Sequence, residues 1–351
     1  MARRANRVDD FANRDGLDEI AFGLIKATAL KAAIELELFT RIAEGHHTVP
    51  ALAHIGETHE RGTRILLDAL CFMGLLSKLH TEYHLSPTAQ AFLVKGKPSY
   101  YGDAILGDFA WGARGEFGKL LRTGKPVLPS AYTEGSETLW AGWAASNLAD
   151  WERQMESVDA LWDKVGVTTE KIKTLRVLDV ASGAGLVSLA LAKRSSVVRV
   201  TAIDRPMVLA YAKQAAEAMG VASQVTFLEG DALNLDLAKE SFDVVLFGNI
   251  TGYLSPEQNI GMFRKAFETL VLSGRVVLTA PISDDDHKGP GQVPMAGVDV
   301  FLFSPEGDIY TSVEYRGMLE MAGFSEVTVH KDDWGLISGR RLELQQAKVE
   351  K

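Results

Sequence analysis

The hydrophobic and polar positions of the first hundred residues repeat with the period of a helix. Apolar residues recur at steps of three or four over residues 18–40, and shorter stretches of the same pattern cover residues 48–54 and 60–76. Residues 76–85 instead alternate as in a short hairpin, with a turn near residues 81–82. Helices followed by a two-stranded wing predict a winged-helix domain.

From residue 175 onward, the pattern changes to short apolar runs separated by helical stretches. Strands are predicted at residues 175–180, 197–203, 225–228, 242–247 and 274–280, and helices at 186–194, 207–219 and 257–270. Strands that alternate with helices in this way form a parallel sheet with helices on both faces. The predicted fold class is therefore α/β: a Rossmann-like, doubly wound, mostly parallel sheet preceded by a mainly helical winged-helix domain.

These changes of pattern divide the chain into three predicted parts. Residues 1–95 form the winged-helix domain, residues 96–164 a helical connector, and residues 165–351 the domain built on the sheet. The connector is less regular than its neighbours and is rich in aromatic residues. A dense group of rings suits the wall of a pocket for a flat apolar ligand, so the connector is also predicted to line the substrate pocket.

Composition narrows the classes of function. The chain has 351 residues, of which 46% are hydrophobic and 24% are charged, and its net charge is −9. An acidic protein is a poor general partner for nucleic acid or anionic membrane, and no stretch approaches the ~20 apolar residues of a membrane-spanning helix. The single cysteine, Cys71, lies in an apolar run and allows no internal disulfide. We expect a cytoplasmic protein that binds neither membrane nor nucleic acid.

A winged helix can nevertheless belong to a DNA-binding transcription regulator. Around residues 58–76, where the recognition helix would lie, the basic residues Arg61 and Arg64 are interspersed with the acidic residues Glu60 and Asp68. Binding to phosphates needs a basic face, so DNA binding is the weaker alternative.

Polar residues and glycines follow the predicted strands at their carboxyl ends, which is where sheets of this kind bind ligands. Gly183 and Gly185 let the backbone turn sharply beside a ligand, and the helix after them favours a carboxylate at its N-terminus. Asp204 is placed to accept hydrogen bonds from ribose hydroxyls, and Asp179 to meet an ammonium group. Asp231 is placed to accept a hydrogen bond from an adenine amino group. The full set is Asp179, Gly183, Gly185, Asp204, Asp231 and Asn249.

The glycine loop by itself is equally compatible with a dinucleotide. In the dinucleotide fingerprint a third glycine follows three residues after the second, and here Ser188 stands in that place. An NAD-binding protein is therefore a second, weaker alternative.

The ordered motifs resemble the class I S-adenosylmethionine (SAM)-dependent methyltransferases of the hydroxyindole and caffeic-acid O-methyltransferase type. The resemblance runs from about Ile20 to Arg341. It is carried by Leu178-Asp-Val-Ala-Ser-Gly-Ala-Gly185, Asp204, Gly230-Asp-Ala232, Gly274-Arg-Val-Val-Leu278, and Pro305-Glu-Gly-Asp-Ile-Tyr-Thr311 before a helix that ends in Met321-Ala-Gly-Phe324. The family implies SAM as methyl donor, a winged-helix dimerisation domain and hence a homodimer, and a small-molecule acceptor held between the domains.

The resemblance also assigns contacts to individual residues. The expected cofactor contacts are Asp179, Ser182, Gly183, Gly185, Asp204, Arg205, Asp231, Ala232 and Asn249. The candidate substrate contacts are Trp111, Trp143, Tyr253, Met295 and Phe303. No group of residues has the spacing of a metal site, so no metal is expected.

Two departures from the family pattern stand out. Ala181 and Ser182 replace family glycines, which is a mild change. The family's general-base histidine falls after the fourth strand, where this chain has Gly252. Tyr253 and His287 are the candidates to replace it, and no catalytic residue is assigned. Methylation at oxygen is the main expectation, while methylation at carbon or nitrogen, or a use of SAM other than methyl transfer, stays open.

Overall fold

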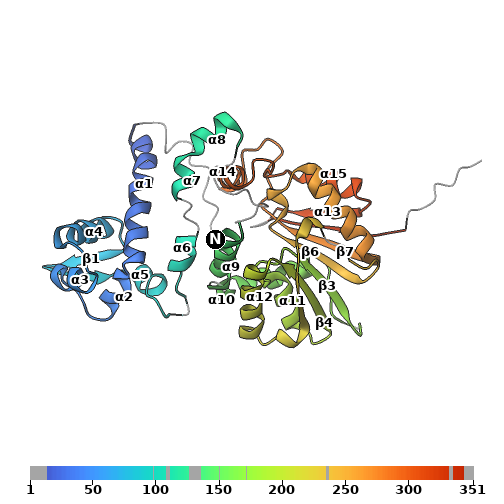
Figure 1. Cartoon of the computed structure of the whole chain (residues 1–351), viewed down its shortest axis with the longest axis horizontal. Coiled ribbons are helices and arrows are strands. Elements are labelled where there is room, and N and C mark those ends of the chain that lie inside the picture. The colour runs from blue at the N-terminus through green and yellow to red at the C-terminus, as the bar shows by residue number, and fades with distance from the viewer. Residues whose placement is uncertain are drawn as a thin grey trace, which may run out of the picture. The chain divides into compact units, whose positions relative to one another are not determined.

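The computed structural model describes residues 14–97, 99–107, 111–125, 136–149, 151–170, 172–234, 237–331 and 335–343. The chain forms two compact units, Met1–Phe109 and Ala110–Lys351 (Figure 1). Among the described residues, no helix combines the length and the apolar character that crossing a membrane requires.

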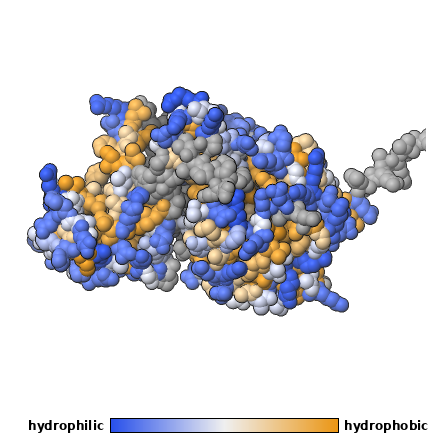
Figure 2. Space-filling model, viewed as in Figure 1, coloured by the Kyte–Doolittle hydropathy of each residue, from blue (hydrophilic) through white to orange (hydrophobic). Residues whose placement is uncertain are grey.

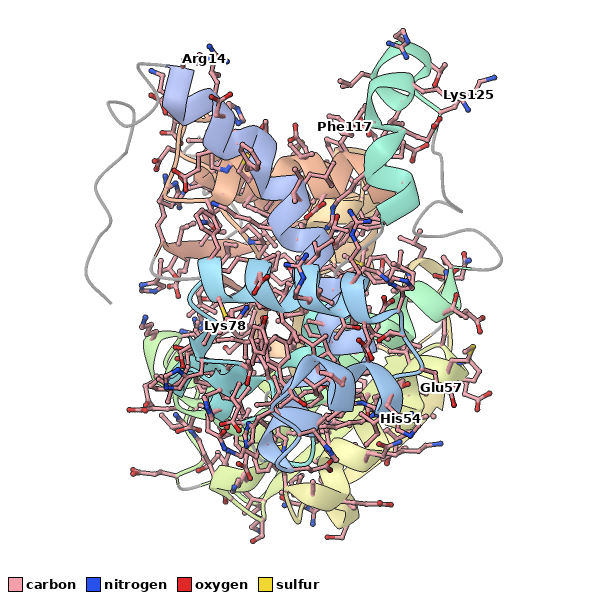
Figure 3. The ribbon with its side chains drawn as sticks, turned by 90° about the vertical axis from the view of Figure 1, so that its left-hand side faces the viewer. Arg14, His54, Glu57, Lys78, Phe117 and Lys125 are labelled. Atoms are coloured by element: carbon pink, nitrogen blue, oxygen red, sulfur yellow. The ribbon has the colours of Figure 1, made fainter. Side chains whose placement is uncertain are left out.

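The first unit consists of one long helix, several short helices and a two-stranded wing. Its elements are α1 (Arg14–Glu35), α2 (Leu38–Ala43), α3 (Val49–Ile55), α4 (Glu60–Phe72), β1 (Leu76–Leu79), β2 (Glu82–Leu85), α5 (Pro87–Phe92) and α6 (Gly102–Gly107). Strands β1 and β2 pair antiparallel, and Lys78 marks this wing in Figure 3, where His54 and Glu57 mark the end of α3 and the turn before α4. The helices and the wing share one apolar core that includes Leu38, Leu67 and Tyr83.

Three boundaries in this unit differ from those expected. The helix expected over residues 18–40 is two helices, because Glu37 has a left-handed φ of 52° and turns the chain so that Leu38 enters the core. Helix α4 ends at Phe72 rather than at residue 76. The hairpin turn lies at residues 80–81, one residue earlier than expected, because Leu79 pairs with Glu82.

The second unit begins with four helices in a region that was expected to be less regular. They are α7 (Trp111–Gly115), α8 (Phe117–Thr123), α9 (Glu137–Ala149) and α10 (Trp151–Lys164). Trp162 of α10 is fully buried against the sheet domain, and its indole nitrogen donates to the Val187 carbonyl oxygen at 2.9 Å. Burial of an aromatic side chain and a satisfied polar atom hold this helix against the sheet domain.

The rest of the unit is a seven-stranded sheet in the order β5-β4-β3-β6-β7-β9-β8. The strands are β3 (Leu175–Val180), β4 (Val198–Asp204), β5 (Val225–Glu229), β6 (Phe242–Gly248), β7 (Leu270–Thr279), β8 (Ser325–His330) and β9 (Leu336–Arg340). The first five are parallel, and β9 pairs antiparallel with β7 and β8. The expected mostly parallel sheet is confirmed.

Two details of the sheet were not expected. Strand β7 begins at Leu270, four residues before its predicted start at residue 274. Strand β9 was not predicted, because Ser338 and Gly339 interrupt its apolar pattern. Its place is set by pairing with both neighbours, which is information that a local sequence window does not contain.

Helices cover both faces of this sheet. They are α11 (Leu186–Arg194), α12 (Pro206–Ala218), α13 (Pro256–Thr269), α14 (Val293–Phe303) and α15 (Ser312–Met321). Alternate residues of β3 point to opposite cores: Val177 packs with α10, α11 and α12, and Leu178 with α13 and α15. Each fully buried aliphatic side chain contributes about 1.5–3 kcal/mol, so the two cores fix the strand ends firmly.

Candidate active site

A cavity of about 560 Å³ lies at the carboxyl ends of the parallel strands, within the second unit. Residues that follow β3, β4, β5, β6 and β7 all contribute to its lining, and α9 and α10 form its other wall. This is the edge at which doubly wound sheets bind ligands, and its volume suits a small-molecule ligand.

The loop between β3 and α11 forms the floor of the cavity. Gly183 and Gly185 have positive φ values of 57° and 73°, and Ala181 also has a positive φ, of 55°. A Cβ atom added at Gly183 would meet no heavy atom within 4 Å, so the backbone there borders open space. The Ser182 hydroxyl is buried and has no hydrogen-bond partner among the described residues. The loop therefore presents backbone and one unsatisfied hydroxyl to a ligand.

Asp204 stands at the end of β4 and lines the same cavity. Its two carboxylate oxygens accept backbone hydrogen bonds, one from Gly183 N and one from Arg205 N, each at 2.8 Å. Burial raises the pKa of Asp204, and the two amide hydrogen bonds oppose that rise. The side chain is thereby held against the glycine loop with lone pairs left for a ligand.

Arg205 follows Asp204 and also lines the cavity. Its guanidinium group donates to the Ser136 hydroxyl at 2.6 Å, and Ser136 lies buried just before α9. This bond joins the strand-end side of the cavity to the helical side.

Asp179 is the second-last residue of strand β3 and is only 2% exposed. The hydroxyl of Ser188, on α11, donates to Asp179 Oδ2 at 2.5 Å. Burial raises the pKa of Asp179 to about 7, the Ser188 hydrogen bond opposes the rise, and the nearby Asp204 adds to it. A carboxyl group that titrates near neutral pH in a cavity is typical of functional sites.

The remaining candidates that follow the strands, Asp231, Ala232 and Asn249, line the same cavity. Asp231 accepts hydrogen bonds from Leu233 N at 3.0 Å and Asn234 Nδ2 at 2.9 Å, which fixes its carboxylate at the start of a short 3-10 turn.

Aromatic side chains form the opposite wall. Trp140 and Trp143 come from α9, and Tyr253 from the turn after β6. The rings of Trp140 and Tyr253 meet edge to face, with centroids 4.9 Å apart and an interplanar angle of 76°. Such a wall suits a flat ring at the mouth of the strand-end site.

The turn after β6 is fixed by buried hydrogen bonds. The Ser304 hydroxyl donates to the Tyr253 carbonyl oxygen at 2.6 Å, and Asn259 Nδ2 donates to the carbonyl oxygens of Thr251 and Leu254 at 2.9 and 3.2 Å. The Thr251 and Tyr315 hydroxyls are 2.8 Å apart. The turn is therefore part of the core, and the position of each of its residues relative to the cavity is set by this network.

Gly252 in this turn is buried and lies outside the cavity lining. A Cβ atom added there would lie 3.3 Å from the Asp308 carbonyl oxygen and 3.9 Å from Val300 Cγ2. The neighbouring Gly307 is so close that a Cβ atom on it would overlap the Gly252 carbonyl oxygen. At the place where the family pattern has its histidine, this chain has two backbones in contact.

The candidates from the sequence divide into two groups. Those that line the cavity are Asp179, Ser182, Gly183, Gly185, Asp204, Arg205, Asp231, Ala232, Asn249, Trp143 and Tyr253. Outside that lining, Met295 is 66% exposed on α14 and Phe303 is buried in the core cluster that also holds Tyr253. His287 is exposed in the loop before α14 and does not line the cavity either. Trp111 begins α7, and its side chain lies outside the described part of the structure.

Several lining or supporting residues were not selected from the sequence. Trp140 lies three residues before the selected Trp143 and Asn147 lies four residues after it, so all three share one face of α9. That spacing in the sequence could have identified this face of α9 as part of the cavity wall. Ser136 accepts a hydrogen bond from Arg205, and Ser188 donates one to Asp179. The sequence marked Ser188 only as the residue in place of a fingerprint glycine, and it did not mark Ser136. Within the described ranges, no three His, Cys, Asp or Glu side chains gather into a possible metal site.

Comparisons with known proteins agree with this geometry. A sequence profile described as a methyltransferase domain matches residues 177–274, and one described as an O-methyltransferase dimerisation domain matches residues 18–95. The first covers the glycine loop and the ends of β3 to β6, and the second covers α1 to α5.

Similarity to individual proteins extends over nearly the whole chain. The 3-hydroxy-5-methyl-1-naphthoate 3-O-methyltransferase of Streptomyces sahachiroi is 28% identical over 321 residues, which cover 89% of each protein. The S-adenosyl-L-methionine-dependent methyl transferase PigF of a Serratia species is 23% identical, with 88% of this chain and 89% of PigF covered. A solved structure assigned as an O-methyltransferase, from Nostoc punctiforme, has a TM-score of 0.81 and 25% identity, and covers 93% of this chain and 99% of that one.

The two profiles, the full-length similarities and the position of the cavity point to one family. The cofactor is SAM rather than a dinucleotide, and the enzyme is a methyltransferase. The chain belongs to the SAM-dependent methyltransferases that carry an N-terminal O-methyltransferase dimerisation domain.

Proposed function

We propose that this enzyme methylates an oxygen atom of a small aromatic acceptor, and that both ligands share the cavity of the second unit. The observation that carries this proposal is the continuity of the cavity. It joins the glycine loop after β3 to the rings of Trp140, Trp143 and Tyr253 without an intervening wall. The aromatic acceptor of the Streptomyces relative is in keeping with such a wall.

The strand-end residues form the cofactor half of the proposed site. Asp204 accepts the ribose hydroxyls, and Asp231 with the Ala232 amide meets the adenine. The open space above Gly183 receives the amino-acid part, which the Ser182 hydroxyl and the N-terminus of α11 bind. Asn249 and Arg205 line the cavity beside these groups. These donors and acceptors fit SAM, which when bound supplies an electrophilic methyl group on its sulfonium.

The helical side of the cavity holds the acceptor in this proposal. Trp140 and Tyr253 meet edge to face and form a rigid corner against which a flat ring can lie. Holding the acceptor oxygen in line with the methyl group supplies much of the acceleration, because correct orientation of two reactants is worth about 7–11 kcal/mol in favourable cases.

No residue of the chain is assigned as general base. Gly252 faces the backbone of Asp308 instead of the cavity, so the histidine of the family pattern has no counterpart there. The acceptor hydroxyl is therefore proposed to be acidic enough to lose its proton to solvent. The same observation favours a second candidate function, in which a carbon or nitrogen atom of the aromatic acceptor attacks and no base at residue 252 is needed.

One experiment tests both candidates. The protein is incubated with SAM and a panel of hydroxynaphthoates, phenols and their methyl ethers, and the products are examined by mass spectrometry and NMR. An O-methyl resonance supports the first candidate, and a C-methyl or N-methyl resonance supports the second. Binding of NAD in place of SAM and of S-adenosylhomocysteine would contradict both.

We further propose that the first unit forms a homodimer interface rather than a DNA-binding surface. Side chains of Leu17, Ile20, Phe22, Leu24 and Ile25 on α1 are between 55% and 66% exposed, and Figure 2 shows hydrophobic residues along this helix. The segment falls mainly within the dimerisation profile. An exposed apolar surface of this kind is typical of a protein interface.

The wing side of the unit does not favour phosphate binding. Asp68 of α4 pairs with Arg64 at 2.9 Å and with Lys78 at 2.8 Å, so a carboxylate shares the surface with two of the basic groups near the expected recognition helix and lowers the local positive charge. Replacement of Ile20 and Leu24 by Glu is expected to halve the mass measured by light scattering at micromolar concentration. A wild-type mass of one chain, or sequence-specific DNA binding at physiological salt, would contradict the proposal.

The division of the chain at about residues 95 and 165 remains our proposal for its functional parts. In it, α6 to α10 act as a connector that also supplies the aromatic wall. Limited proteolysis that cuts first near these two boundaries would support it, and cuts confined to other loops would contradict it.

A further inference from the structure

Ser188 stands where the dinucleotide fingerprint has its third glycine, and the structure gives this serine a specific partner. Its hydroxyl is fully buried, 2.5 Å from Asp179 Oδ2 and 3.1 Å from the Gly185 carbonyl oxygen. The three groups form a short chain of oxygen atoms directly beneath the loop proposed to hold the cofactor.

A hydroxyl group donates one hydrogen bond and can also accept one, so the hydrogen bonds among these three oxygen atoms can be arranged in two ways. When Asp179 is ionised, the Ser188 hydroxyl donates to the carboxylate. When Asp179 is protonated, its own O–H donates to Ser188 Oγ, and the Ser188 hydroxyl turns to donate to the Gly185 carbonyl oxygen. Neither state requires a heavy atom to move or leaves a buried polar group without a partner.

The surroundings of Asp179 favour the uncharged state in the protein alone. Its partners across β4 and β6 are Ala202 and Leu246, which are apolar and buried. The charged group that acts on Asp179 from β4 is Asp204, which repels a second negative charge. From α11 it meets the neutral Ser188. A buried carboxylate without a positive partner is costly, so the protonated form is favoured. An ammonium group beside the carboxylate favours the ionised form instead.

We propose that Asp179 and Ser188 form a proton-coupled cofactor contact, in which Asp179 is protonated in the protein alone and ionised beside the cofactor ammonium. On binding, the Asp179 O–H bond breaks and its proton passes to the solvent, while the Ser188 hydroxyl turns from the Gly185 carbonyl oxygen to Asp179 Oδ2. Ser188 is thus a positioning residue that serves both states. The inference rests on the proposed function, since it requires SAM or its product at the glycine loop.

Release of a proton on cofactor binding is expected in the neutral pH range, because burial raises the pKa of Asp179 to about 7. If the bound state is fully ionised, binding releases close to one proton at pH 6 and a smaller fraction of a proton at pH 7.5. An α-ammonium group, with a pKa of about 8, keeps its charge over most of this range.

The test is isothermal titration calorimetry with S-adenosylhomocysteine between pH 6 and 7.5, in pairs of buffers with different ionisation enthalpies. The buffer dependence of the heat gives the number of protons released. The matched ligand is 5′-methylthioadenosine, which has the adenosine and the sulfur but no ammonium. It is expected to bind without proton release, and release equal to that with S-adenosylhomocysteine would overturn the proposal.

Two variants test whether the released proton comes from Asp179. Asp179→Asn is expected to abolish the release while binding persists with reduced affinity. Ser188→Ala is expected to move the midpoint of the release upward by about one pH unit, because the ionised carboxylate loses a charge-assisted hydrogen bond. Ser338→Ala is the control, since Ser338 is equally buried but lies on β9, which β6 and β7 separate from β3, and bonds to Arg275 and Thr328. Its midpoint is expected to equal that of the wild type.

The outcomes separate this inference from the proposed function. Binding of S-adenosylhomocysteine without proton release, or with the same release in Asp179→Asn, overturns the inference and leaves the methyltransferase assignment intact. Failure of both SAM and S-adenosylhomocysteine to bind at any pH overturns both. If Asp179→Asn does not fold, infrared difference spectra of the wild type decide. Loss of a protonated carboxyl C=O band on addition of the product supports the proposal, and an unchanged band contradicts it.

Discussion

The two sides of the cavity are built in different ways. The cofactor side consists of strand ends and a glycine loop, where Gly183 N and Arg205 N hold the Asp204 carboxylate by backbone hydrogen bonds. The proposed acceptor side consists of helix α9 and the turn Thr251–Tyr253. The rings of Trp140 and Tyr253 meet there, and the side chains of Ser304 and Asn259 hold the carbonyl groups of the turn. One side depends on local backbone geometry, and the other on tertiary packing.

This difference indicates that the reactive groups on the acceptor side can change without a change on the cofactor side. In our proposal, the cofactor side presents the groups that bind SAM. On the acceptor side, contact of Gly252 with the backbone of Asp308 and Gly307 removes a side chain from the reaction without opening the core. Changes on one side should therefore leave the other largely intact, and this independence can be tested.

The largest effect is expected on the acceptor side, from Gly307→Ala. A Cβ atom there would lie 2.9 Å from Tyr253 Cα and overlap the Gly252 carbonyl oxygen. Because both are backbone atoms that cannot move aside, the free energy of unfolding should fall by about 2–3 kcal/mol in urea titrations. Gly297→Ala is the control, with only an ordinary contact of 3.7 Å to Ile309. An unchanged urea midpoint for Gly307→Ala would show that the turn is not rigid.

On the cofactor side, Asp204→Ala should weaken S-adenosylhomocysteine binding by about 1.5–3 kcal/mol, the range for hydrogen bonds to a charged group. Calorimetry measures this loss directly. Asp286→Ala serves as control, because Asp286 is exposed and pairs only with its neighbour Lys288 among the described contacts. Equal affinities of the two variants would place the ribose elsewhere in the cavity.

Removal of the buried charge should stabilise the protein without cofactor. The pKa of Asp179 is raised in the folded state, so its contribution to stability is full below its unfolded pKa and is lost as the pH rises through about 7. Asp179→Asn stays neutral, and its melting temperature should therefore exceed that of the wild type at pH 8 by a few degrees, corresponding to about 1 kcal/mol, and by less at pH 5.

The control for this prediction is Asp286→Asn, because the Lys288 ammonium lowers the pKa of the exposed Asp286. It should show no such gain at pH 8. A lower melting temperature for Asp179→Asn at pH 8 would mean that the ionised carboxylate is stabilising in the protein alone.

The smallest effects are expected for Tyr253→Phe and His287→Ala. Neither residue is assigned as a base, so each change should lower the single-turnover rate by less than about tenfold, compared with about 10²–10⁴-fold for the loss of a general base. The rates are measured from pH 6 to 9 with an acceptor identified in the panel. A loss near 10⁴-fold in either variant, with loss of one limb of the pH profile, would reveal a relocated base.

The sequence alone predicted the sheet domain well and the acceptor side poorly. Strands β3, β4, β5 and β6 are short apolar runs, each followed by or ending in glycine or short polar residues, and their order along the edge of the sheet follows from right-handed crossovers. The residues after these strands were predicted to gather, and they do. By contrast, Met295 and Phe303 were chosen as substrate contacts and lie outside the cavity lining, because helix periodicity does not say which neighbour a face meets.

What the sequence by itself determined is the α/β class, the glycine loop and the acidic residues that follow successive strands. These features are local, because a parallel strand needs an apolar run and the turn after it needs glycine or a short polar residue. The tertiary structure alone decided that Trp140 meets Tyr253, that Ser188 meets Asp179, and that Gly252 faces a backbone instead of a ligand. Each is a contact between segments distant in the chain or a choice between two faces of a turn, and packing of the whole core settles such choices.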